Sequence, residues 1–125
     1  MLESDTEYLD GKGWSWTFHE SERPPLLVIH NYELPSGFSE ARVELLIEVP
    51  DTYPDAKLDM FWVYPVVTLA GGAAPRQSQE RRDFDGKLWQ RFSRHLENWR
   101  PETDTLQTYL VWIHNHLIDD AQAGP

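Results

Sequence analysis

The sequence lacks cysteine entirely across its 125 residues. Without a thiol the chain cannot form disulfide bonds, zinc–thiolate sites or iron–sulfur clusters, and it cannot use a thiolate nucleophile. A chain of this length, 40% apolar and 13% aromatic, can bury enough surface to fold without such cross-links. We therefore expect one globular domain over residues 1–125, with no cofactor and no metal site.

Basic residues are also scarce, because 11 Lys and Arg stand against 21 Asp and Glu, for a formal net charge of −10. This excess of negative charge repels nucleic-acid phosphates and anionic lipid head groups, so neither nucleic acid nor a membrane is expected as a partner. No apolar run approaches the length of a membrane span, and the acidic N-terminus does not resemble a signal peptide. These absences predict a cytoplasmic protein.

Positive charge is concentrated in one part of this acidic chain. Residues 76–100 hold seven basic and four acidic side chains, a net charge of +3, whereas the segments on both sides are acidic. Such a segment is either a solvated surface of mixed charge or a site that stabilises developing negative charge. Both interpretations stay open at this point.

The first half of the chain has the patterns of β-strands separated by turns. Residues 14–20 and 42–49 alternate apolar with polar side chains, and residues 26–32 and 58–63 are rich in apolar, β-branched or aromatic side chains. Proline and glycine occur in the connections. Because short connections join antiparallel neighbours, the four segments predict an antiparallel meander.

The second half of the chain changes character. Residues 66–80 show neither periodicity and predict a long loop. Residues 83–99 have apolar side chains at helical spacing, although an irregular packed segment also fits. The last helix is predicted by a capping pair, Asp104 and Gln107, and by one apolar stripe, with a fraying tail over residues 119–125. The stripe comprises Leu106, Tyr109, Leu110, Ile113 and Leu117. Strands followed by helices predict an α+β domain with helices on one face of the sheet.

Three motifs, in this order, resemble those of the ubiquitin-conjugating-enzyme (UBC) fold. Residues 49–61, Val-Pro-Asp-Thr-Tyr-Pro-Asp-Ala-Lys-Leu-Asp-Met-Phe, resemble that family's connection between its third and fourth strands. Asp85-Gly86 resembles its Asn-Gly, and Trp99-Arg100-Pro101 resembles the Trp-x-Pro before the helix that follows its active site. The resemblance implies a UBC-like fold, with a four-stranded antiparallel meander and a long active-site segment before the C-terminal helix.

Residues 89–95, Trp-Gln-Arg-Phe-Ser-Arg-His, are similar to the stretch before the Trp-x-Pro in a prokaryotic UBC-like group called family E. The resemblance implies a bacterial ubiquitin-like conjugation pathway, with phage defence as the suspected setting. It also implies three kinds of partner: a ubiquitin-like protein, an activating-enzyme-like protein and a target protein.

Two departures from the UBC pattern bear on chemistry. An ordinary member has cysteine three residues after the glycine, whereas this chain has Trp89 there. Where the family has His-Pro-Asn, whose Asn steadies the oxyanion of the reaction, this chain has Tyr64-Pro65-Val66. The chain therefore cannot form a thioester, and either a hydroxyl has taken over the reaction or the activity has been lost.

Ser93 is the candidate nucleophile, because it lies between the Gly86 and Trp99 motifs, where the UBC family keeps its cysteine. A serine hydroxyl needs an adjacent base at neutral pH. In a helix Ser93 and Glu97 could meet, while Ser93 and His95 would be about 200° apart; in an extended chain Ser93 and His95 share a face. A histidine base therefore predicts a non-helical backbone at residues 93–95, or a partner from elsewhere such as His114 or Asp83.

Arg91 and Arg94 are the candidates for stabilising negative charge in the reaction. Ser93, His95, Arg94, Arg91 and Glu97 together form the predicted catalytic set. The leading hypothesis is an acyl carrier that holds a ubiquitin-like C-terminus as an oxyester on Ser93. The alternative is a catalytically inactive UBC-fold module that docks a ubiquitin-like protein or an activating enzyme.

Overall fold

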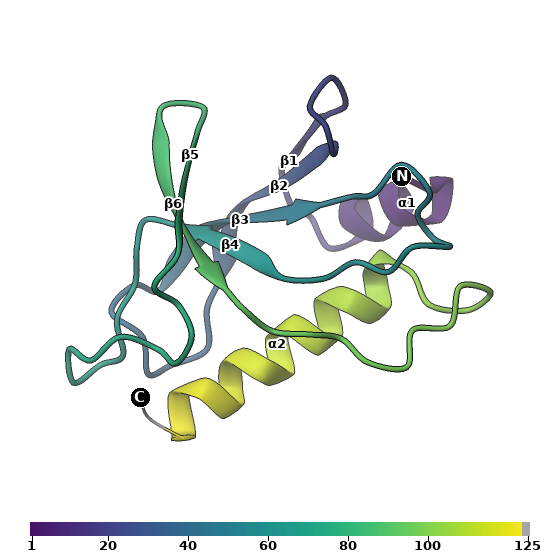
Figure 1. The fold of residues 1–125 in the computed structure, drawn as a ribbon. Coiled ribbons are helices and arrows are strands. Elements are labelled where there is room, and N and C mark those ends of the chain that lie inside the picture. The colour runs from purple at the N-terminus through teal and green to yellow at the C-terminus, as the bar shows by residue number, and fades with distance from the viewer. Residues whose placement is uncertain (124–125) are drawn as a thin grey trace.

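A computed structural model describes residues 1–123 and shows two helices and six strands (Figure 1). In chain order they are α1 (Glu3–Gly11), β1 (Trp16–His19), β2 (Leu26–Glu33), β3 (Arg42–Glu48), β4 (Phe61–Tyr64), β5 (Arg81–Phe84), β6 (Lys87–Phe92) and α2 (Leu106–Ala123). All strands belong to one antiparallel sheet in the order β1-β2-β3-β4-β6-β5. The α+β class and the meander of the first four strands are thus confirmed. The sheet is larger than the four strands expected.

The fourth strand begins three residues later than the pattern at 58–63 indicates. Met60 has a φ of 53°, which is in the left-handed region that breaks a regular strand. β4 therefore starts at Phe61, and residues 58–60 approach it as an irregular segment.

The prediction of a helix over residues 83–99 is wrong, because this stretch forms a β-hairpin followed by an irregular segment. Asp85 and Gly86 have φ values of 54° and 72°, and two consecutive positive φ values make a tight turn that suits two right-handed twisted strands. The apolar side chains at helical spacing do not share one buried face: Leu88 is 46% exposed, whereas Phe92 is fully buried. Residues 66–80 form the expected irregular connection.

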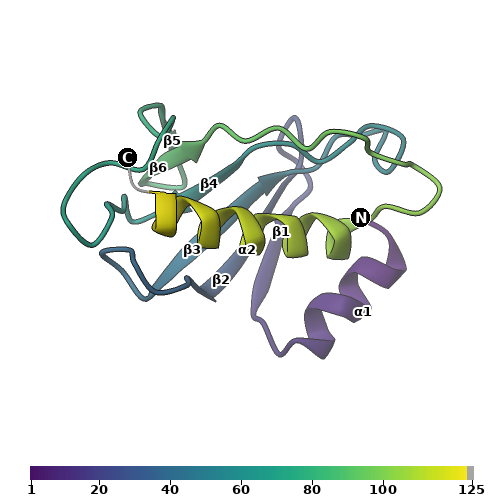
Figure 2. The ribbon, with the colours of Figure 1, turned by 90° about the horizontal axis from the view of Figure 1, so that it is seen from below.

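Helix α2 covers one face of the sheet (Figure 2). The predicted apolar stripe is confirmed, since all five of its side chains are buried in a cluster with Leu27, Ile29, Leu45 and Ile47 of the sheet. The predicted cap is wrong: Asp104 accepts a hydrogen bond from the Arg100 N–H, while the Leu106 N–H donates to the Tyr53 hydroxyl at 2.7 Å. The helix also continues through residues 119–123, which were expected to fray; residues 124–125 lie outside the described part.

Helix α1 is a short, polar element that the sequence patterns did not indicate. Leu9 anchors it in the same core as α2, and Asp5 is buried. Asp5 accepts hydrogen bonds from the Tyr53 hydroxyl (2.9 Å) and the Leu106 N–H (3.3 Å), so it joins α1 to the start of α2. Both helices pack against one core on one face of the sheet, but α1 stands in place of the helix expected over residues 83–99. Within residues 1–123, no helix is long and apolar enough to cross a membrane.

The opposite face of the sheet carries a second, smaller core. It comprises Leu26, Val28, Leu46, Trp62 and Trp89, with Tyr64 and Phe84 packed against it. The sheet curls so strongly that the rings of His19 in β1 and Phe84 in β5, from its two edge strands, meet at 5.0 Å. Figure 1 shows the β5–β6 hairpin and the end of β1 rising on the side away from α2. We call this side the open face.

Candidate functional site

The segment that carries Ser93 leaves the sheet at the end of β6 and is not helical. The Ser93 N–H donates to the Gln77 carbonyl at 3.1 Å, and the Arg94 N–H donates to the Phe92 carbonyl at 3.0 Å, which makes a three-residue turn centred on Ser93. The backbone at residues 93–95 is thus non-helical, which a histidine base for Ser93 at His95 requires. Ser93 is only partly buried, and among residues 1–123 its hydroxyl takes part in no hydrogen bond.

His95 is oriented by a carboxylate that the sequence patterns missed. Its Nδ1 lies 3.2 Å from Asp59 Oδ2, and the Leu96 N–H donates to Asp59 Oδ1 at 3.3 Å. An ionised carboxylate only accepts hydrogen bonds, so the neutral imidazole carries its proton on Nδ1 and leaves Nε2 bare. The His95 side chain is 60% exposed. A bare, exposed Nε2 held by Asp59 has the arrangement of a general base.

Arg91 borders a cleft of about 290 Å³ on the open face, next to the Asp59–His95 pair. The cleft is lined by Glu48, Asp59, Met60, Trp62 and Arg91. The Arg91 guanidinium bonds to Glu80 at 2.7 Å, contacts the Met60 sulfur and lies 5.9 Å from the centroid of the Trp62 ring. Its side chain remains 24% exposed, and its charge is balanced by Glu80.

Arg94 points to the other side and is committed to a structural role. Its side chain is 2% exposed and donates to Asp120 Oδ2 of α2 at 2.8 and 3.2 Å and to the Arg76 carbonyl at 2.8 Å. Arg76 bonds to the second oxygen of Asp120 at 3.3 Å. These contacts leave Arg94 turned away from the cleft. The signal for this pair was in the sequence, since Asp120 continues the buried 113–117 side of α2 and a buried acid needs a partner.

The other proposed partners of Ser93 are placed differently. Glu97 is exposed, and the i, i+4 contact expected for it requires a helix that does not form. Asp83 lies in β5 opposite Leu88, toward the hairpin turn and away from the end of β6. His114 lines a separate cavity on the other side of the sheet. Of the expected bases, His95 is the one whose surroundings suit the role.

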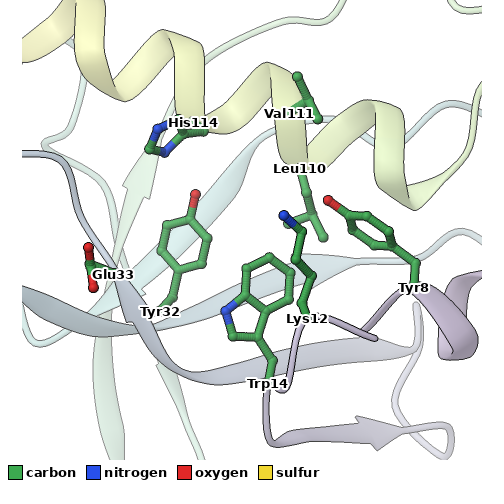
Figure 3. A pocket seen from close by; sticks show the side chains of 8 residues that line it. All are labelled: Tyr8, Lys12, Trp14, Tyr32, Glu33, Leu110, Val111 and His114. Atoms are coloured by element: carbon green, nitrogen blue, oxygen red, sulfur yellow. The ribbon is translucent and has the colours of Figure 1, made fainter. Parts of the chain in front are cut away.

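The separate cavity, of about 300 Å³, lies between α1, β2 and α2 (Figure 3). Tyr8, Trp14 and Tyr32 form its aromatic wall, and the Lys12 ammonium lies 5.7 Å from the Tyr8 ring centroid and 5.9 Å from that of Trp14. Burial, with a smaller contribution from Tyr8, raises the pKa of Tyr32 to about 12. No residue of the 91–97 segment lines this cavity, so it is not part of the Ser93 site.

A buried tryptophan side chain occupies the position at which an ordinary UBC protein has cysteine. Trp89 is 1% exposed in the core of the open face, and its indole N–H donates to the Phe84 carbonyl at 3.1 Å. Tyr64, where the family has the histidine of His-Pro-Asn, packs on Trp89 with ring centroids 5.8 Å apart. Both positions are therefore structural in this chain.

Comparison with known proteins agrees with this architecture. The model of the prokaryotic E2 family E matches residues 1–120. A search of curated proteins and a search of solved structures found no match. This match covers nearly the whole chain, including the three UBC-like motifs and both elements that flank Ser93. The chain, which has no cysteine to carry a thioester, belongs to the prokaryotic E2 family E of UBC-like domains.

Proposed function

We propose that this protein is an acyl carrier of the conjugating-enzyme type that holds the C-terminus of a ubiquitin-like protein as an oxyester on Ser93. Family membership implies ubiquitin-like and activating-enzyme-like partners in general. The absence of cysteine leaves a hydroxyl as the replacement for the thiol. The pathway would then pass the acyl group to a target protein, in a bacterial setting such as phage defence.

The observation that carries the proposal is the Asp59–His95 pair, in which His95 is two residues along the chain from Ser93. In the transfer, Ser93 Oγ attacks the thioester carbonyl of the ubiquitin-like protein on its activating enzyme, and His95 Nε2 takes the hydroxyl proton. The tetrahedral intermediate collapses, the C–S bond breaks, and the departing thiolate takes the proton from His95. Arg91, a cation that lines the cleft, would stabilise the oxyanion, whereas Arg94 is turned away from it.

The test is to incubate the protein with its activating enzyme, ATP and the ubiquitin-like protein. A covalent adduct that survives denaturant and thiols but is cleaved by hydroxide is the expected product, because an oxyester resists thiols better than a thioester. Ser93→Ala should abolish the adduct. Ser21→Ala is the control, since Ser21 is an exposed serine in the loop between β1 and β2. An undiminished adduct on Ser93→Ala would exclude Ser93.

The second candidate function is a binding module without catalysis. It is favoured by the buried Trp89 at the cysteine position and by a Ser93 hydroxyl that makes no hydrogen bond among the described residues. Such a module would dock a ubiquitin-like protein or an activating enzyme. Measurable affinity by calorimetry, with no adduct under any condition of the assay above, would distinguish it from the carrier.

A further inference from the structure

A second hydroxyl–imidazole–carboxylate arrangement lies on the open face, away from Ser93. Thr17 of β1, His30 of β2 and Glu44 of β3 come from three adjacent strands. Thr17 Oγ1 lies 2.8 Å from His30 Nε2, and His30 Nδ1 lies 2.6 Å from Glu44 Oε2. This is the connectivity of a catalytic triad, in which the carboxylate holds one ring nitrogen and the hydroxyl contacts the other.

The direction of the two hydrogen bonds follows from their chemistry. The ionised Glu44 carboxylate can only accept, so the neutral His30 ring has its proton on Nδ1. The Nε2 atom is then an acceptor, and the Thr17 hydroxyl must donate to it. His30 is therefore placed to remove the Thr17 proton. The His30 and Glu44 side chains are 36% and 31% exposed, and Thr17 is open to solvent.

The pairing of β2 with β3 is regular as far as His30 and is distorted directly after it. The pairing of β2 with β3 shifts register between Ile29 and Tyr32, and Asn31 within this bulge has a φ of 59°. Bulges re-aim side chains and are frequent beside active sites. A left-handed residue inside a central strand costs free energy that regular pairing would avoid. His30 lies opposite Glu44 because the regular register, in which Ile29 pairs with Leu45, continues by one residue, and the bulge at Asn31 ends this register next to the site.

A small pocket of about 150 Å³ adjoins the three residues. It exists because the β5–β6 hairpin curls over the open face. Its lining comprises Thr17, His30 and Glu44, the side chains of His19, Val28, Phe84 and Trp89, and the ion pair of Lys87 with Asp85, whose Nζ and Oδ2 atoms are 3.8 Å apart. The apolar wall suits a short acyl chain, and the Lys87 ammonium supplies positive charge for an oxyanion.

We propose that Thr17, His30 and Glu44 form a hydrolytic site for small carboxylic esters or thioesters. Thr17 Oγ1 adds to the carbonyl carbon while His30 Nε2 takes its proton, and the alcohol or thiol leaves with that proton. Water then adds to the acyl-threonine while His30 Nε2 takes a proton from it. The ester bond to Thr17 breaks, the Thr17 oxygen takes that proton back from His30, and the carboxylic acid is released. Glu44 positions the imidazole throughout.

This site is independent of the carrier function at Ser93. The substrate here is a small ester that fits the pocket, whereas the carrier receives a protein C-terminus from an activating enzyme. Thr17, His30 and Glu44 lie on β1, β2 and β3, and the Asp59–His95 pair lies beyond the end of β6. The assay below needs no ubiquitin-like protein, no activating enzyme and no ATP, so its failure says nothing about Ser93.

The experiment uses the full chain and p-nitrophenyl butyrate as the probe. The folded protein should release p-nitrophenolate faster than the same protein unfolded in urea does. The unfolded chain is the control for unassisted catalysis by imidazole, because all five of its histidines are exposed to solvent. Mass spectrometry of a rapidly quenched sample should locate a butyryl group on Thr17. Thr17→Ala and His30→Asn should lower the rate by about 100-fold, the usual contribution of a positioned base.

Two further variants separate catalysis from a structural role. Thr17→Ser keeps the hydroxyl and should retain most of the rate, whereas Thr103→Ala, which changes another exposed threonine, should leave the rate unchanged. Circular dichroism establishes that each variant is folded. The proposal is overturned if folded Thr17→Ala hydrolyses the ester as fast as the wild type, if the wild type is no faster than the unfolded chain, or if the butyryl group is found only on other residues.

Discussion

Asp120→Ala should destabilise the protein more than any other single change of a charged side chain discussed above. Asp120 and Arg94 are 1% and 2% exposed and are joined by two hydrogen bonds of 2.8 and 3.2 Å. The pair ties the last turns of α2 to the segment that follows β6. Removing the carboxylate leaves the Arg94 guanidinium buried, with the Arg76 and Ser93 carbonyls as its remaining partners.

The expected loss of unfolding free energy is about 3–5 kcal/mol, the usual result of leaving one partner of a buried ion pair uncompensated. This is a large part of the total stability of about 5–15 kcal/mol that is typical of a domain. The matched surface pair, Arg42 with Glu33, is 54% and 72% exposed at 3.2 Å. Glu33→Ala should therefore cost about 0–1 kcal/mol.

The assay is urea unfolding followed by tryptophan fluorescence, with a double-mutant cycle. Replacing both partners, as in Arg94→Met with Asp120→Leu, should restore most of the stability that Asp120→Ala loses, because no buried charge then remains unpaired. The reasoning is refuted if Asp120→Ala costs no more than Glu33→Ala. It is also refuted if the apolar double variant is less stable than Asp120→Ala.

Three further predictions concern single side chains. Trp89→Cys should not restore a thioester, because this position is 1% exposed. The folded variant should react slowly with iodoacetamide, and its unfolding free energy should fall by about 3–5 kcal/mol because a large buried side chain is replaced by a small one. Rapid labelling of the folded variant would contradict this prediction. Stability should fall as pH rises from about 10 toward 12, since burial raises the pKa of Tyr32 to about 12 and folding therefore favours its neutral form above the unfolded pKa of about 10. Tyr32→Phe should make urea unfolding less sensitive to pH over this range, and an unchanged slope would be evidence against the assignment. Asp59→Asn should slow oxyester formation on Ser93 by about tenfold or more without weakening the affinity for the ubiquitin-like protein, because the hydrogen bond that fixes the proton of His95 on Nδ1 becomes weaker. Single-turnover kinetics measure this rate, and an unchanged rate would show that Asp59 takes no part in the mechanism.

The elements with simple periodicity were predictable from the sequence. The strand at 42–49 alternates except at Leu46, and its Val43, Leu45 and Ile47 face the core with α2 as that alternation predicts. The stripe of α2 was predictable for the same reason. Local spacing determines which face of a regular element is apolar, and the apolar face must be buried.

The hairpin of β5 and β6 was missed because two signals conflicted. Apolar side chains at spacings of 4, 4 and 3 favoured a helix over 83–99, while Asp85-Gly86 is typical of a two-residue hairpin turn. The turn residues were decisive, since both adopt positive φ. Helix α1 was missed for another reason: its stability comes from contacts of Asp5 and Leu9 with distant parts of the chain.

The sequence by itself determined the class of the fold, the resemblance to the UBC family and the absence of thiol chemistry. Only the tertiary structure decided which side chains meet there: Asp59 is 36 residues from His95, and Asp120 is 26 residues from Arg94. It alone also brought Thr17, His30 and Glu44 together. The physical reason is that periodicity reports which face a residue occupies, whereas contacts between elements depend on sheet register, bulges and turns that no short window of sequence contains.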